Sequence, residues 1–214
     1  IKHHTSKPGG AIFITDAREI TSKKSVYYNN TASSGGAIFV QKCHKIHFQF
    51  AKFLNNMAKA FGGAGKIEAN IFLDNDSYYE GNEARSAGAF DINQVKKAQH
   101  VNCVYYKNKA YESCGTLCMT QIRILLLVNT SFLYNHAVQT AGSFIAININ
   151  NFTSINASFV GNRVGRSKGG AVVQKNVQIA EFWGNHFRNN SCYSSGGGID
   201  LESVKLVVIV HSVF

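Results

Sequence analysis

One short motif returns along the whole chain at nearly constant spacing. It is a triplet of small residues of the Gly-Gly-Ala type, and its second position is glycine in every copy. The copies begin at Gly9, Gly35, Gly62, Ala87, Cys114, Ala141, Gly169 and Gly196. Subtracting neighbouring numbers gives steps of 26, 27, 25, 27, 27, 28 and 27 residues. A period of about 20–50 residues is typical of solenoids and other repeat arrays, in which each unit packs on its neighbours.

A second motif keeps the same phase. Upstream of each triplet after the first, an aromatic residue is followed three positions later by asparagine, from Tyr27 and Asn30 to Phe187 and Asn190. We expect the aromatic rings to fill the core, coil on coil. We also expect the asparagines to form one inward ladder of hydrogen bonds that satisfies the turn amides. The residues of this ladder are Asn30, Asn56, Asn82, Asn108, Asn135, Asn162 and Asn190.

The residues that follow each triplet alternate in character. Large apolar residues predominate at the third place, as in Ile12 and Ile38, and at the fifth, as in Ile14 and Val40, with a mixed set between them. This alternation is typical of a strand with one buried face, and no stretch has helical periodicity with caps. The sequence therefore predicts an all-β protein, a right-handed parallel β-helix of about eight coils with about 27 residues each. It covers residues 1–214 as a single domain, because no linker interrupts the repeat.

The two motifs, Gly-Gly-Ala before Ile, Val or Leu and Phe-x-x-Asn, resemble the repeats of chlamydial polymorphic outer membrane proteins. They are also similar to repeats of large pectin-lyase-like surface proteins of other bacteria and of protists. The resemblance covers essentially the whole chain. It departs at Cys114-Gly115-Thr116, at Ala141-Gly142-Ser143 and where tyrosine replaces phenylalanine. It implies an extracellular or cell-surface location and a role in adhesion, and it identifies no active site.

The two ends of the sequence carry an expectation about partners. The chain begins at Ile1, and Phe214 lies one period after Phe187, where another copy of the aromatic motif would open. Bare strand edges pair with other chains. We therefore expect a piece of a longer solenoid that meets further coils or other chains end to end. The apolar runs 124–128 and 206–210 are too short to cross a bilayer, and we expect them to be buried strands and no membrane span in this segment.

Five cysteines leave at least one thiol unpaired within the chain. Cys114 and Cys118 are the one pair that lies close in sequence. They are either small buried hydrophobic residues or a local disulfide, and the sequence leaves both open. Six N-glycosylation sequons favour a secreted eukaryotic glycoprotein. They start at Asn29, Asn75, Asn129, Asn151, Asn156 and Asn189.

The formal net charge is +10, and basic residues recur in the turns before the triplets. Stacked coils would align them into a ridge. Such a ridge is either a solvated row of turns or a track for an anionic glycan, a lipid headgroup or an acidic protein. Nucleic acid is not expected as a partner, because no recognised binding module accompanies the charge. The residues are Lys7, Lys59, Arg85, Lys109, Arg163, Arg166 and Lys168.

A catalytic function has to be considered, because parallel β-helices include polysaccharide lyases and hydrolases. Glycosidic cleavage needs two carboxyl groups about 5–10 Å apart. Asp91 and Asp200 share a coil position but are separated by four coils, or roughly 19 Å at the strand spacing. Asp74 and Asp76 cluster with Glu80 and Glu83 near a turn, where we expect solvated side chains rather than a calcium site.

These observations favour a non-catalytic structural or adhesive segment of a secreted or cell-surface repeat protein, with no catalytic residues, metal or cofactor. The glycine-rich stretch at 61–68 lacks the first glycine, the Ser/Thr and the helix of a phosphate-binding loop. The alternative is a carbohydrate-active β-helix, of the lyase or hydrolase kind, or a glycan-binding module. The two differ in an observable way, because an enzyme needs a groove with converging acidic or basic groups.

Overall fold

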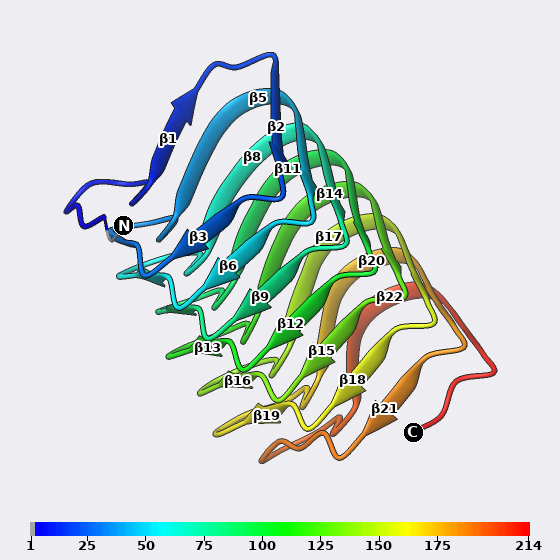
Figure 1. The fold of residues 1–214 in the computed structure, drawn as a ribbon. Helices are drawn as coiled ribbons and strands as arrows, with labels where there is room; N and C mark the ends of the chain where they lie inside the picture. The colour runs from blue at the N-terminus through cyan, green and yellow to red at the C-terminus, as the bar shows by residue number, and fades with distance from the viewer. Residues whose placement is uncertain (1–2) are drawn as a thin grey trace.

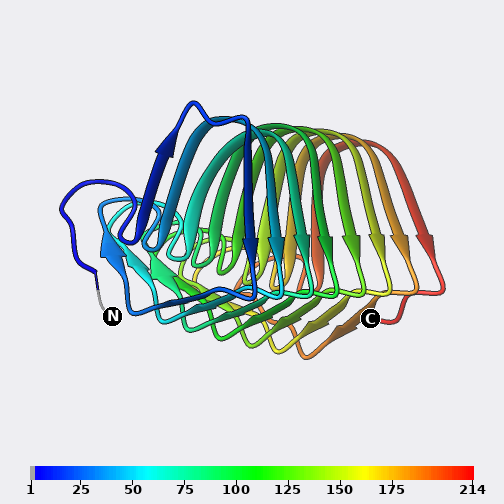
Figure 2. The same cartoon turned by 45° about the horizontal axis from the view of Figure 1, so that its top comes forward.

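The computed structural model describes residues 3–214, and within that range the chain is a parallel β-solenoid without any helix (Figure 1). The coils stack in chain order, and in Figure 2 the long strands arch over the two sheets of short strands. The sheet of long strands has the order β1 (Ile12–Thr15), β5 (Ile38–Gln49), β8 (Gly65–Asn75), β11 (Phe90–Val101), β14 (Leu117–Val128), β17 (Phe144–Ile155), β20 (Val172–Trp183) and β22 (Ile199–Val210). A further strand, β2 (Glu19–Lys23), also pairs with β5.

Two sheets of short strands complete each coil. One consists of β3 (Val26–Tyr28), β6 (Lys52–Leu54), β9 (Tyr78–Glu80), β12 (Val104–Tyr106), β15 (Ser131–Leu133), β18 (Ser158–Val160) and β21 (His186–Arg188). The other consists of β4 (Thr31–Ala32), β7 (Met57–Ala58), β10 (Glu83–Ala84), β13 (Lys109–Ala110), β16 (His136–Ala137) and β19 (Arg163–Val164). Equivalent residues of successive coils are paired, as in Tyr79 with Tyr105 and Tyr105 with Phe132.

The number of coils differs from the sequence prediction. The β3–β21 sheet contributes one strand per turn and has seven strands, so the chain completes about seven turns rather than eight. The reason is that one complete turn runs from one triplet to the next. Eight triplets therefore delimit seven complete turns. The last triplet is followed by β22, after which the chain reaches Phe214 before another pair of short strands can form.

The asparagine ladder and the aromatic column run side by side through the interior, as the motifs predicted. In each rung the side-chain oxygen of one asparagine accepts hydrogen bonds from the backbone and side-chain amides of the asparagine one coil earlier, at 2.9–3.2 Å. The adjacent rings stack with centroids 4.5–5.1 Å apart, from Tyr27 to Phe214. Asn56, Asn82, Asn108, Asn135 and Asn162 are completely buried.

The two leading residues of the triplet have different physical roles. The first adopts a left-handed conformation in every coil, including Ala87, Cys114 and Ala141, where φ is 61°, 64° and 56°. The second is glycine because the coils approach too closely there for a side chain. A Cβ on Gly88 would clash with the backbone carbonyl oxygen of Gly115 in the next coil, and the same clash recurs at the interior interfaces. This close backbone approach explains why the second position is glycine even where the first is not.

Two expectations about burial are corrected. The apolar runs in β14 and β22 were expected to be buried, but alternate residues of each face outward, and Ile124 is 41% exposed. In β22 no further coil covers the inward column, so Val207 and Ile209 are 39% and 47% exposed. Asp74 was expected on a solvated turn, yet it lies inside the solenoid with no exposed surface. It is the second-to-last residue of β8, and its side chain points into the core from there.

Candidate functional site

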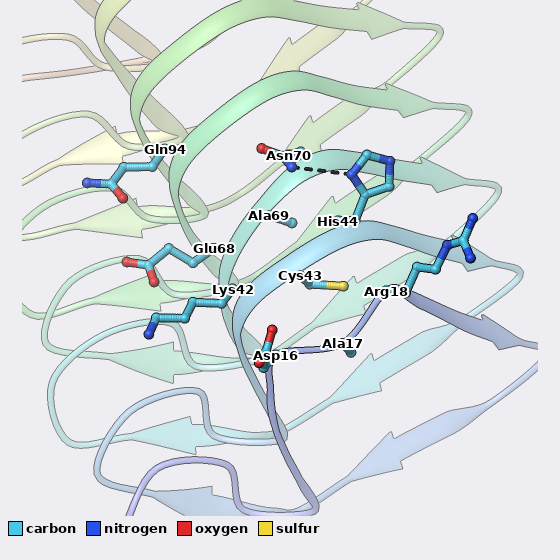
Figure 3. A pocket seen from close by; sticks show the side chains of 10 residues that line it. All are labelled: Asp16, Ala17, Arg18, Lys42, Cys43, His44, Glu68, Ala69, Asn70 and Gln94. Atoms are coloured by element: carbon cyan, nitrogen blue, oxygen red, sulfur yellow. Dashed lines mark hydrogen bonds between the residues drawn. The ribbon is translucent and has the colours of Figure 1, made fainter.

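A hollow of about 590 Å³ lies on the outer surface where the long strands turn a corner (Figure 3). Most long strands have a residue with positive φ at this corner, such as Lys42 in β5 and Gln94 in β11. β8 is one residue shorter, and its pairing register shifts at the corner against both neighbours. The hollow is lined by Asp16, Ala17, Arg18, Lys42, Cys43, His44, Glu68, Ala69, Asn70 and Gln94.

The side chains around the hollow are polar and carry both signs of charge. Lys42, Glu68 and Gln94 extend from one side of the corner, and Arg18 and His44 from the other (Figure 3). Within residues 3–214, neither Glu68 nor the two cations Arg18 and Lys42 has an ion-pair partner within 4.0 Å. These charges are therefore available to a bound molecule.

Small and buried residues form the floor of the hollow. Cys43 is 3% exposed, and its thiol donates a hydrogen bond to the Lys45 carbonyl oxygen at 3.3 Å. Burial raises the pKa of this thiol above its ordinary value, so it remains protonated at neutral pH. On the rim, the Asn70 side-chain amide and the His44 Nδ1 are 3.3 Å apart. The arrangement offers charged groups, amides and an imidazole to a polar ligand, with no activated nucleophile among the residues of the floor.

The basic residues expected to form one ridge fall into separate groups. Pairing in the β4–β19 sheet places Lys109, His136 and Arg163 in one outward row. Lys59 and Arg85, which directly follow the last residues of β7 and β10, form part of a second row. The remaining members, Lys7, Arg166 and Lys168, lie in the turns that follow.

Acidic residues interrupt this basic surface. Arg85 Nε lies 3.4 Å from Glu112 Oε2. Lys168 Nζ lies 3.5 Å from Asp200 Oδ2 and 3.0 Å from Glu202 Oε2, and the hydrogen bond to Glu202 raises the pKa of Lys168. The continuous basic row is therefore Lys109–His136–Arg163. Burial, followed by the charges of Lys109 and Arg163, lowers the pKa of His136.

The structure joins Cys114 and Cys118 in a disulfide that links the triplet of one coil to the start of β14. Cys43, Cys103 and Cys192 are free thiols. Among the sequons, Asn129, Asn151, Asn156 and Asn189 are exposed, whereas Asn29 and Asn75 are half-buried. Attachment of glycans at these positions stays a prediction.

The two acidic residues considered for catalysis do not converge. Asp91 and Asp200 occupy one outward column four pairings apart, as the sequence indicated. Asp91 Oδ2 lies 3.4 Å from Lys66 Nζ, and burial nevertheless raises the pKa of the Asp91 carboxyl. Each carboxylate is thus engaged with a lysine in its own part of the solenoid.

The two ends of the stack lack a neighbouring coil. At one end, β22 is the outermost strand of its sheet, and Phe214 is 65% exposed although its ring stacks on Phe187 at 4.8 Å. At the other end, Phe13 is 55% exposed. Among residues 3–214, no helix has the length and apolar character needed to cross a membrane.

Taken together, the sheets and the interior columns define a parallel β-solenoid protein with a polar surface hollow. No protein-family model matches the chain, and neither the curated proteins nor the solved structures gave a match. The likeness to polymorphic outer membrane proteins therefore rests on the repeat motifs alone.

Proposed function

We propose that this chain is a non-catalytic, rigid segment of a secreted or cell-surface repeat protein and that its terminal coils meet further solenoid coils or other chains end to end. The observation that carries the proposal is the state of the last coil. Its backbone edge is unpaired, and its inward residues Val207, Ile209 and Phe214 are exposed, whereas the equivalent residues of the interior coils are buried. Unpaired strand edges of this kind are templates for pairing with another chain.

The glycine column supports a specific mode of contact. At an interior interface, such as that of Gly170 with Gly197, the glycine approaches the carbonyl oxygen of the next coil too closely for a Cβ. Gly197 is the last member of this column, and a Cβ built there meets only the Asn190 carbonyl oxygen, at 3.4 Å. A second copy that continued the solenoid would place its Gly10 against Gly197. Such head-to-tail contacts do not close, so they generate filaments.

The test is to measure association of the 1–214 chain by sedimentation velocity over a range of concentrations. We expect concentration-dependent end-to-end association that changes little with salt, because backbone pairing and apolar packing dominate the contact. Gly197→Ala should leave the circular dichroism spectrum and the unfolding midpoint unchanged while it weakens association at least tenfold. Lys97→Ala, on the middle of the long sheet, is the matched surface control. A wild-type chain that remains a monodisperse monomer at high concentration would overturn the proposal.

A second candidate function is glycan binding, and the hollow at the β8 corner favours it. The hollow combines Arg18, Lys42 and Glu68 with the amides of Asn70 and Gln94, and these groups suit the hydroxyl and carboxylate groups of an acidic sugar. Titration with defined oligogalacturonates, followed by NMR, tests it. Lys42→Gln should weaken binding, whereas Lys205→Gln, on the last strand, should not. Turnover of pectate, alginate or chondroitin by the pure chain would overturn the non-catalytic proposal.

A further inference from the structure

A cluster of polar side chains lies inside the solenoid across two successive coils. Asp74 and His100 occupy an inward column that is filled elsewhere by apolar residues or serine, namely Ser22, Phe48, Leu127, Ser154 and Phe182. Both side chains have no exposed surface. A carboxylate in such surroundings is costly unless it is neutralised or paired with a cation.

The cluster is tightly connected. Asp74 Oδ2 accepts a hydrogen bond from the Tyr79 hydroxyl at 2.7 Å and lies 3.2 Å from His100 Nδ1. The Tyr105 hydroxyl lies 2.8 Å from that same nitrogen and 3.3 Å from Asp74 Oδ2. Cys103 is also completely buried, and its thiol donates to the Asp74 carbonyl oxygen at 3.4 Å. Three types of metal-ligating side chain thus share one small volume.

The protein alone does not complete this network. Asp74 Oδ1 and His100 Nε2 are buried and have no hydrogen-bond partner among the described residues. Buried polar atoms are nearly always satisfied, and each such group left alone costs on the order of 1–3 kcal/mol. The protein itself therefore pairs the polar groups of this cluster incompletely, and a metal ion bound by both oxygens of the Asp74 carboxylate would give Oδ1 the partner that it lacks.

We propose that Asp74, His100 and Cys103 bind a divalent transition-metal ion, zinc in the first instance, inside the solenoid. Their ligand atoms all lie within 4.8 Å of one another. Tetrahedral zinc with bonds of about 2.0–2.3 Å places its ligand atoms about 3.3–3.8 Å apart. The 3.2 Å separation of Asp74 Oδ2 and His100 Nδ1 is already close to that value, so the thiol has the main movement to make. The Tyr105 hydroxyl is positioned beside both of these atoms as a fourth ligand.

Charge and ligand type select the ion. One carboxylate and one thiolate neutralise a divalent cation, which removes the cost of an isolated charge in the core. A set with sulfur and imidazole nitrogen suits zinc or another late first-row metal rather than calcium or magnesium, which prefer oxygen ligands. Burial raises the pKa of the Cys103 thiol well above its ordinary value, so metal binding must release a proton there.

The Cys103 thiol also forms hydrogen bonds to backbone carbonyl oxygens of its own coil and of the preceding coil. Its thiol lies 3.4 Å from the Val101 carbonyl oxygen, and one coil later the Thr130 hydroxyl makes the equivalent pair of bonds to Val128 and His100 at 3.1 and 3.2 Å. A hydroxyl group at this position of the coil can therefore form the same two hydrogen bonds to backbone carbonyl oxygens as the thiol does. Cys103→Ser should keep the fold and remove the soft ligand.

The test uses the whole 1–214 chain, refolded with zinc or cobalt because the closed core gives no entry path to the folded protein. After desalting, we expect one zinc per chain by elemental analysis. The cobalt form should show a thiolate-to-cobalt charge-transfer band that Cys103→Ser abolishes. His100→Leu, which copies Leu127 of the next coil, should reduce bound zinc at least tenfold. Substoichiometric zinc in the wild type, or a cobalt spectrum that Cys103→Ser leaves unchanged, would overturn the proposal.

Discussion

The side-chain oxygen of Asn108 accepts two hydrogen bonds from Asn82 of the preceding coil, at 3.0 Å from the backbone amide and 2.9 Å from the side-chain amide. Asn108 in turn donates to the Tyr79 carbonyl oxygen at 3.0 Å and to Asn135 Oδ1 at 3.2 Å. One buried side chain therefore ties its own coil to the coils on both sides. Removing it strands groups in its neighbours, which is more costly than losing the asparagine itself.

The first prediction follows from this arrangement. Asn108→Leu should lower the free energy of unfolding by about 1–3 kcal/mol for each buried group left without a partner. Asn70→Leu, which loses a surface contact with His44, should cost less than about 0.5 kcal/mol. Urea denaturation followed by circular dichroism measures both. Equal unfolding midpoints for the two variants would contradict a stabilising role of the ladder.

A second prediction concerns the glycine column. Gly88→Ala should destabilise the chain by about 1–3 kcal/mol or prevent folding, because its Cβ has no room beside Gly115. Gly197→Ala holds the equivalent position in the last coil, where the added methyl group meets no following coil, and should be nearly neutral in the monomer. Thermal unfolding at low concentration compares them. Similar losses at both positions would show that conformation rather than inter-coil clash selects glycine.

The third prediction concerns the number of reactive thiols before and after reduction of the disulfide. The unfolded, non-reduced chain should react with three equivalents of a maleimide, at Cys43, Cys103 and Cys192, and the reduced chain with five. Closing so short a loop should contribute about 2 kcal/mol in the chain-entropy description. Reduction or Cys118→Ser should therefore lower the urea midpoint. Five adducts before reduction would contradict the disulfide.

A fourth prediction concerns pH. The pKa of His136 is lowered in the folded state, so between its folded and unfolded pKa values the unfolded chain binds more protons. Stability is therefore lost as the pH falls from about 8 through the ordinary histidine range. His136→Gln should reduce this loss, and Lys109→Gln should reduce it in part, because one of the two neighbouring cations is removed. Urea midpoints at pH 8 and pH 5.5 measure the effect, and identical slopes in the wild type and His136→Gln would refute it.

The repeat alone was sufficient to predict the sheets, the ladder and the stacked rings, because two motifs in constant phase fix which residues face inward near them. At the corner of the long strands, which neither motif includes, the alternation of inward and outward residues is interrupted. There two successive residues face outward, such as Asn70 and Ile71, before alternation resumes. His44 and His47 both lie on the outer surface for the same reason, although simple alternation places residues three apart on opposite faces. The burial of Asp74 and the hollow therefore escaped prediction.

A signal for the buried cluster was nevertheless present in the sequence. Tyrosine replaces phenylalanine in three coils, and in each the tyrosine hydroxyl meets a polar residue five positions earlier. The pairs are Ser22 with Tyr27, Asp74 with Tyr79 and His100 with Tyr105, at 2.8, 2.7 and 2.8 Å. These replacements look like degeneracy when each motif is read alone. They become informative only when the inward column and the aromatic column are known to be neighbours.

The short β8 strand shows that the corner tolerates a change of length. The inward residues of β5, β8 and β11 stay in register on both sides of it, so the missing residue is absorbed entirely on the outer surface. An added peptide between Lys42 and Cys43 should be absorbed in the same way. Because equivalent corners recur at about 4.8 Å, peptides grafted into chosen coils would be displayed along one line at selectable multiples of that spacing. The solenoid would then serve as a molecular ruler for presenting epitopes or enzymes.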